Sequence, residues 1–296
     1  MDVFTKKLEA ASTGDRESCL DLLEFMRKEK VRAPEVAMKV GQKLISGGGL
    51  SADSLYTIYE QTFLAALDVN DTDVQDSCIL ALKKKFPDSS RVQRLELMLL
   101  EANGKFSQAD AFYKDMLVKN PSNMLVVKRQ VAIYKAQGKI DDAIGKLNEL
   151  LKNFQTDAGS WVELADLYLS VGNYTKAAFC FEELILTNPL NAFYHERLAE
   201  VYMSIGGVDN LKIARKHLAH SLELNETGRG LMALIMCTSS LAALKSRQEK
   251  DDKELNQRLH QYAVTKLQAA YRAKASEDIA SIADEVITAT NEPFAE

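Results

Sequence analysis

Residues 159–189 read GSWVELADLYLSVGNYTKAAFCFEELILTNP, and this stretch decides the fold. Trp161, Leu164 and Tyr168 recur at the three- and four-residue spacing of one helix face, so the first half predicts a helix with an apolar stripe. Gly172 lies where that pattern stops, and a residue without a Cβ can adopt the positive φ of a tight reversal. The stretch therefore begins with a helix that turns back at a glycine.

The second half of the stretch predicts another helix that returns along the first. Ala177 is small enough to let the two helices approach closely. Pro189 ends this helix, because proline removes a backbone donor and cannot continue the hydrogen-bond pattern. Residues 159–189 thus predict a pair of antiparallel helices.

The same pattern recurs along the chain every 34 residues. Residues at this step are Gly104, Gly138, Gly172 and Gly206; Ala109, Ala143 and Ala177; Tyr134, Tyr168 and Tyr202; and Pro87 and Pro121, with Pro189 two steps further on. A period of 34 is typical of the tetratricopeptide repeat, in which each unit is one helix pair. We therefore expect an all-α fold, a right-handed α-solenoid of tetratricopeptide-type helix pairs with atypical helical end caps.

Three parts of the chain follow from where the repeat is recognisable. We expect an N-terminal helical cap at residues 1–50, about five tetratricopeptide repeats at 51–226, and a C-terminal helical cap with an acidic tail at 227–296. The first repeat is degenerate, since Gln75 stands where the small alanine is expected. In the last repeat about three extra residues follow Gly206, and we expect them to lengthen the turn.

Composition limits the class of protein. Hydrophobic residues make up 46% and charged residues 27%, the mix of a folded soluble protein, and only 5 prolines and 14 glycines are present. The net charge of −5 disfavours a nucleic-acid binder. Four isolated cysteines argue against a disulfide framework or a zinc site. We expect neither a signal peptide nor a membrane span, because the chain has no long apolar run.

No constellation of catalytic residues emerges, and we predict that the protein is not an enzyme and holds no cofactor and no metal. The P-loop, HExxH and GxSxG patterns are absent from the sequence. His217 and His220 lie three apart on one predicted helix, but no third ligand is evident. Cys180 and Trp161 fall at repeat positions that favour packing over chemistry.

Charge on the first helix of each pair indicates a binding surface. In this architecture the first helices line a concave groove, and helical spacing places five cations on groove-facing positions of two successive pairs: Arg91, Arg94, Lys128, Arg129 and Lys135. The next two pairs carry Glu163, Asp166, Glu196 and Glu200 there, so the groove would be basic at one end and acidic at the other. We predict that the basic end binds a partner; the alternative is a solvated surface of mixed charge.

Several stretches resemble one family within the tetratricopeptide-repeat proteins. Residues 58–67 (IYEQTFLAAL), 174–191 (YTKAAFCFEELILTNPLN) and 206–211 (GGVDNL) are similar to the second subunits of the endoplasmic reticulum membrane protein complex. The resemblance covers about residues 55–225. It implies a non-catalytic scaffold, peripheral on the cytoplasmic face of the endoplasmic reticulum membrane.

Further expectations follow from the same resemblance. The partners would be the other subunits of that complex, membrane-embedded and cytosolic, and the assembly would insert transmembrane segments, including tail anchors. Two alternatives stay open: a free cytosolic adaptor that binds acidic peptides in its groove, and an enzyme with an unrecognised site.

Overall fold

The structure is a computed structural model that describes residues 3–244, 250–290 and 292–294. Within these ranges the chain forms sixteen α-helices, one short 3-10 helix and no strand, which confirms the predicted all-α helix-pair fold. Two compact units divide the chain at residues 133 and 134, inside helix α8, and each is described by itself. The predicted division at residues 50 and 226 stays a prediction, and Glu296 of the predicted acidic tail lies outside the described residues.

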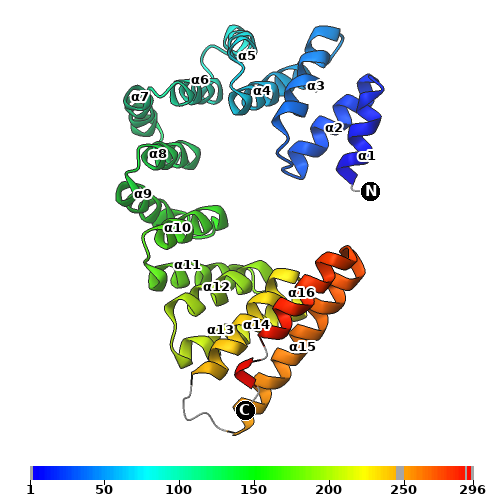
Figure 1. Ribbon diagram of the computed structural model, residues 1–296. Helices are drawn as coiled ribbons and strands as arrows, with labels where there is room; N and C mark the ends of the chain where they lie inside the picture. Colours follow the sequence, from blue (N-terminus) through cyan, green and yellow to red (C-terminus); the bar gives the residue numbers. More distant parts are fainter. Residues whose placement is uncertain (1–2, 245–249, 291, 295–296) are drawn as a thin grey trace. The chain divides into compact units, whose positions relative to one another are not determined.

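The first unit contains helices α1 to α7 and most of α8. Their bounds are α1 Val3–Ser12, α2 Arg16–Lys28, α3 Pro34–Gly47, α4 Ala52–Val69, α5 Thr72–Lys85, α6 Ser90–Ala102, α7 Phe106–Lys119 and α8 Met124–Ala136. Phe63 and Leu95 are buried in the core that α1 to α6 share, and Tyr113 in the core of α6, α7 and α8. Neighbouring helices of the unit pack side by side (Figure 1).

The second unit runs from the last turn of α8 to the end of the chain. Its remaining elements are α9 Ile140–Asn153, α10 Ala158–Ser170, α11 Tyr174–Thr187, α12 Ala192–Ile205, α13 Val208–Leu224, α14 Gly228–Ala243, α15 Lys250–Lys274, α16 Glu277–Ala289 and the 3-10 helix Glu292–Phe294. One large apolar cluster joins α12, α13, α14, α15 and α16. Buried Arg215 of α13 also forms an ion pair with Asp252 and a 3.1 Å hydrogen bond to the Asn256 side chain, which together hold α15 against α13.

Four glycines spaced 34 residues apart make the reversals inside the helix pairs. Gly104, Gly138 and Gly172 have φ of +71°, and Gly206 has φ of +76°. A Cβ built on any of them would meet no atom within 4 Å, so there is room for a side chain. The constraint is the left-handed backbone, which costs other residues about 1–2 kcal/mol.

The first repeat accommodates a glutamine where later repeats have alanine. Gln75 of α5 is 2% exposed, and its amide nitrogen donates a 3.0 Å hydrogen bond to the carbonyl oxygen of Ala66 in the last turn of α4. A buried amide without a partner would be costly, and this bond supplies one. The larger side chain is therefore tolerated because the neighbouring helix offers an acceptor.

The predicted long turn after Gly206 is wrong. Only Gly206 and Gly207 separate α12 from α13, whereas the three residues Val171 to Asn173 separate α10 from α11. The extra residues extend the start of α13, which has 17 residues against 14 in α11. Three residues make nearly one turn of 3.6, so the insertion lengthens the helix and keeps its buried face close to phase.

Trp161 is half-buried, whereas the sequence predicted a core position. Its indole nitrogen donates a 2.7 Å hydrogen bond to the Gln155 carbonyl oxygen, and its ring meets the ring of Phe179 edge-on at 6.1 Å between centroids. In the same repeat Tyr168 is 7% exposed and Ala177 has no exposed surface, while Pro189 follows the end of α11 and is itself exposed. The half-buried ring of Trp161 on α10 therefore packs against Phe179 of α11, the second helix of the pair.

A matched pair of glycine substitutions tests the reversal. Gly172→Ala should lower the free energy of unfolding by about 1 kcal/mol, because alanine must then adopt the left-handed conformation. Gly145→Ala, within α9 where glycine is unfavourable, should instead raise it by about 0.5–1 kcal/mol. Urea unfolding followed by circular dichroism measures both, and a gain in stability from Gly172→Ala would contradict the assigned turn.

Candidate partner-binding site

The five predicted cations lie on the first helices of the repeats. Arg91 and Arg94 are on α6, Lys128 and Arg129 are on α8, all in the first unit, and Lys135 is in the last turn of α8, which belongs to the second unit. We call the surface formed by the exposed side chains of α4, α6, α8, α10, α12 and α14 the first-helix face, and we describe it separately in each unit.

Two of these cations bind carboxylates of the preceding first helix. The guanidinium of Arg91 meets Glu60 of α4 in two contacts, at 2.9 and 2.6 Å. That of Arg129 meets both carboxylate oxygens of Glu101 on α6, one of them at 3.1 Å. Such two-point contacts between a guanidinium and a carboxylate are stronger and more directional than single ones.

Glu101 is buried, and two neighbouring side chains supply hydrogen bonds to its carboxylate. It is 9% exposed, and the Tyr113 hydroxyl donates a 2.7 Å hydrogen bond to the same oxygen that Arg129 contacts at 3.1 Å. Burial works against the charged form of Arg129, but the hydrogen bond and the charge of Glu101 raise its pKa above the ordinary value. Burial, then Glu101, raises the pKa of Tyr113, which stays a neutral donor. The three side chains form a satisfied polar cluster between α6, α7 and α8.

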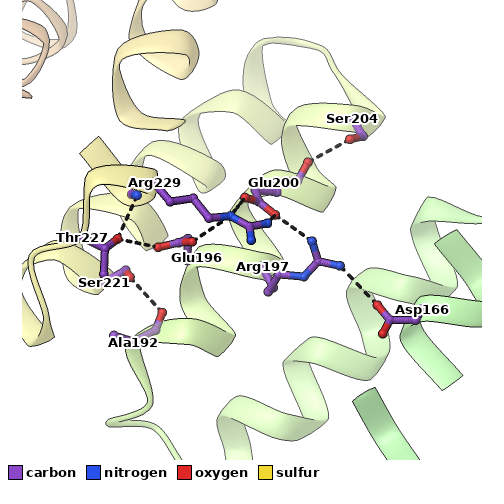
Figure 2. A network of polar contacts seen from close by, with 10 residues as sticks. Asp166, Ala192, Glu196, Arg197, Glu200, Ser204, Ser221, Thr227 and Arg229 are labelled. Atoms are coloured by element: carbon purple, nitrogen blue, oxygen red, sulfur yellow. Dashed lines mark hydrogen bonds and ion pairs between the residues drawn. The ribbon is translucent and has the colours of Figure 1, made fainter. Parts of the chain in front are cut away.

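In the second unit the acidic positions are paired as well. Lys135 donates to Glu163 of α10 at 2.7 Å. Figure 2 shows Arg197 of α12 between Asp166 of α10, at 3.2 Å, and Glu200 of its own helix, at 2.9 Å. Each predicted acid in this part of the face therefore has a basic partner nearby.

Arg229 of α14 extends the network to the next first helix (Figure 2). It contacts Glu200 at 2.7 Å through two nitrogens and Glu196 at 3.0 Å. Glu196 is 5% exposed and also accepts a 2.9 Å hydrogen bond from the Thr227 hydroxyl. That hydroxyl in turn accepts from the Gly230 amide and so caps α14, which links the charge network to the start of the helix.

These contacts follow a rule that was not recognised from the sequence. Six ion pairs join a first helix to the next one, and their members are 28 to 33 residues apart. The step is one to six residues shorter than the repeat, so the partners face each other across neighbouring first helices. Glu60, Glu101 and Arg229 were missed, and a search for opposite charges at this step would have found them.

The sequence predicted a groove with a basic end and an acidic end, but in the structure most of these charges are paired with opposite charges of the same chain. Arg91, Arg129 and Lys135 are opposed by carboxylates, and their charges do not stand alone. Arg94 is half-buried on α6 and makes no ion pair with any residue that the structure describes, and Lys128 is half-buried on α8. That these cations bind a partner stays a prediction, and Arg94 is the residue best suited to test it.

A third histidine joins the two that the sequence singled out. His195 of α12 stacks on His217 of α13, with their Nδ1 atoms 3.0 Å apart. The ring of His220 meets the ring of His195 edge-on. Because a carbonyl only accepts, the 2.9 Å contact of His195 Nε2 with the Pro189 oxygen makes Nε2 the donor. Neutral His195 therefore accepts from Nδ1–H of His217. No group among the described residues has a geometry suited to a metal ion.

The four cysteines are all buried as free thiols. Burial raises the pKa of Cys78 to about 11, and that of Cys180 and Cys237 to about 12. These three thiols are therefore protonated at neutral pH, and a neutral thiol is a poor nucleophile. Cys180 acts as packing in α11, as its repeat position suggested.

The helix pairs, their glycine reversals and the 34-residue period define a tetratricopeptide-repeat protein. A family model described as the EMC2 TPR-like repeat domain matches residues 79–208. The chain is 38% identical to ER membrane protein complex subunit 2-A of Xenopus laevis over 258 residues, 86% of each protein. It is 36% identical to ER membrane protein complex subunit 2 of Dictyostelium discoideum over 208 residues, 69% of this chain and 65% of that protein.

The chain therefore belongs to the ER membrane protein complex subunit 2 family, which confirms the predicted resemblance. Among solved structures, the C-terminal part of a TPR repeat-containing protein from Cytophaga hutchinsonii shares the fold, with a TM-score of 0.53 at 16% identity over 84% of this chain and 94% of that one. In the part of this chain that the structure describes, no helix has both the length and the apolar character that crossing a membrane requires.

Two arginine substitutions separate the buried ion pair from the exposed one. Arg129→Met should lower the free energy of unfolding by about 2–3 kcal/mol, since it leaves the buried Glu101 carboxylate without its charged partner. Arg91→Met removes a pair whose arginine is exposed and should cost about 0–1 kcal/mol. Urea unfolding measures both, and equal losses would show that burial of Glu101 does not matter.

The histidine cluster should make stability depend on pH. Burial, followed by the neighbouring His195, lowers the pKa of His217 below its ordinary value of 6.5, although Glu182 opposes this. The unfolded chain then binds more protons at mildly acidic pH, so stability falls as the pH drops below about 6.5 towards the folded pKa.

The measurement is the urea midpoint at about pH 7.5 and about pH 5.5. His217→Gln should reduce the difference between the two midpoints. His220→Gln, on the same helix but exposed, should keep most of it. An unchanged difference in His217→Gln would mean that other groups cause the pH dependence.

Proposed function

We propose that this chain is a non-catalytic scaffold subunit of the endoplasmic reticulum membrane protein complex. The observation that carries the proposal is the 38% identity to a relative named as subunit 2 of that complex, over 86% of both chains. In this role the protein lies on the cytoplasmic face of the endoplasmic reticulum membrane, held by the other subunits, and supports the insertion of transmembrane segments, including tail anchors.

The physical features of the chain agree with a scaffold. Its recurring repeat residues build helix pairs, and within each unit ion pairs between residues 28 to 33 apart join successive first helices. Three of its cysteines have raised pKa values and serve packing. Within each unit such stacked helices offer a preorganised surface, and preorganisation lowers the entropic cost of holding a partner.

The first-helix face of the first unit is the surface we assign to a partner segment, with Arg94 as its main charged contact. Arg94 is half-buried and makes no ion pair within the described ranges, whereas Arg91 and Arg129 already bind carboxylates. An acidic partner side chain would give Arg94 a counter-charge in a partly dehydrated place. Charges of this kind affect both the rate of association and the lifetime of the complex.

A rescue experiment tests the proposal. Cells that lack the protein would receive a tagged wild-type chain, Arg94→Glu or Lys84→Glu, the last as a charge-matched control on the exposed face of α5. We expect the wild type to purify from detergent-solubilised membranes with a fixed set of membrane proteins, and a tail-anchored reporter to insert. Arg94→Glu should reduce both severalfold while Lys84→Glu should not, because only Arg94 faces the assigned partner.

The outcomes separate the alternatives. Recovery of the wild-type chain with a transient soluble partner would replace the scaffold by a free adaptor that binds acidic peptides. Turnover by the isolated chain would support an enzyme. Normal assembly of Arg94→Glu, with an unchanged melting curve, would leave the scaffold in place but remove Arg94 from the contact.

A further inference from the structure

The outer face of α16 carries an apolar stripe that no described residue of the second unit covers. Ile279, Ile282 and Val286 are 54%, 62% and 58% exposed. Their spacing of three and four residues places them on one side of the helix. Ala280 and Ile287 lie on the inner side, where α16 packs along α15 (Figure 1). The helix is thus apolar on two adjoining sides, and only one of them is buried.

The exposed stripe forms one wall of a groove. An open hollow of about 370 Å³ lies beside it, lined by Met232 of α14, Tyr271 of α15 and the apolar residues of α16. Its lining is almost wholly apolar, and methionine is a flexible side chain that adapts to different partners. We call the stripe and this hollow together the α16 groove.

Acidic side chains border the α16 groove. Asp278 and Glu285 are exposed and stand four residues before and three residues after Ile282, so they neighbour it on the helix surface. With Glu277 they make no ion pair among the described residues, whereas Asp284 is bound by Arg272 at 2.7 Å. No lysine or arginine occurs from residue 275 to residue 296. The border on α16 is therefore acidic and carries no cation, and Arg272 of α15 is paired with Asp284.

We propose that the α16 groove docks a basic amphipathic helix of a partner protein. Apolar side chains of that helix would fill the hollow beside Ile282 and Val286, and its lysines or arginines would pair with Asp278 and Glu285. The 13 residues of α16 extend about 20 Å, which gives a partner helix several turns of contact. Recognition of an amphipathic helix by an apolar groove is a recurring mode of binding.

The charges argue against two other occupants. A second copy of α16 would bring two acidic borders together, and like charges in an interface are costly. An anionic membrane surface would be repelled for the same reason, since helices that lie on membranes are usually rich in lysine and arginine. Only a basic amphipathic partner offers both apolar side chains for the stripe and positive charges for its acidic border.

The inference is independent of the proposed function, because it concerns the purified chain and a peptide. The probe is a fluorescent helical peptide of about 18 residues, with leucine at i, i+3, i+4 and i+7 and lysine elsewhere. Its counterpart carries glutamate at every lysine position. Fluorescence anisotropy at physiological salt measures the binding of each peptide to the full-length protein.

We expect saturable binding of the lysine peptide and at least about tenfold weaker binding of the glutamate peptide. Ile282→Ser with Val286→Ser should weaken binding of the lysine peptide about tenfold, with the melting temperature unchanged because both residues are exposed. Asp278→Lys with Glu285→Lys should reverse the preference between the peptides. Leu186→Ser with Leu190→Ser, at exposed leucines outside α16, should change nothing.

Other results would overturn the proposal. Equal binding of the lysine peptide to wild type and to Ile282→Ser with Val286→Ser would show that the peptide binds elsewhere. A concentration-dependent dimer that this double variant abolishes would make a second copy the occupant. Tight binding of the chain to anionic vesicles, lost in the same variant, would make it a lipid surface.

Discussion

One methyl group in each second helix sets the distance between the helices of a pair. Ala109, Ala143, Ala177 and Ala214 have no exposed surface, and each lies in the helix that follows a glycine reversal. A larger side chain there would separate the backbones, unless a neighbour could satisfy it as the Ala66 carbonyl satisfies Gln75. Because the helices approach closely, their remaining apolar faces are presented to the neighbouring pairs, and the stack forms.

The close stacking also determines how the charged residues are used. First helices of successive pairs are near enough for Glu60 to bind Arg91 and for Glu200 to bind Arg229. Exposed pairs of this kind contribute little to stability, but the buried carboxylates of Glu101 and Glu196 require their partners. Much of the charge on the first-helix face is therefore neutralised within the chain, and a partner would recognise shape together with the few groups left over, such as Arg94.

Helix α16 is the last α-helix that the structure describes. Solenoids need end units whose outer face is polar. Helix α16 meets this requirement only in part, since Asp278 and Glu285 border a stripe of exposed isoleucine and valine. A terminal helix that covers the core and leaves apolar surface is suited to extend the stack by a helix from another protein. The first-helix face and the α16 groove would then serve different partners.

From the sequence alone, the all-α class, the helix pairs, the reversals at Gly104 to Gly206 and the family could all be read. They follow from periodicity and from backbone preferences that act within a few residues. The sequence did not reveal that the insertion after Gly206 extends α13, because three extra residues fit a loop or a helix equally well until packing selects the phase. The partners of Arg129 and His217, and the exposure of Ile282, depend on which side chains meet across separate helices. Local preference leaves those contacts open, and close packing decides them.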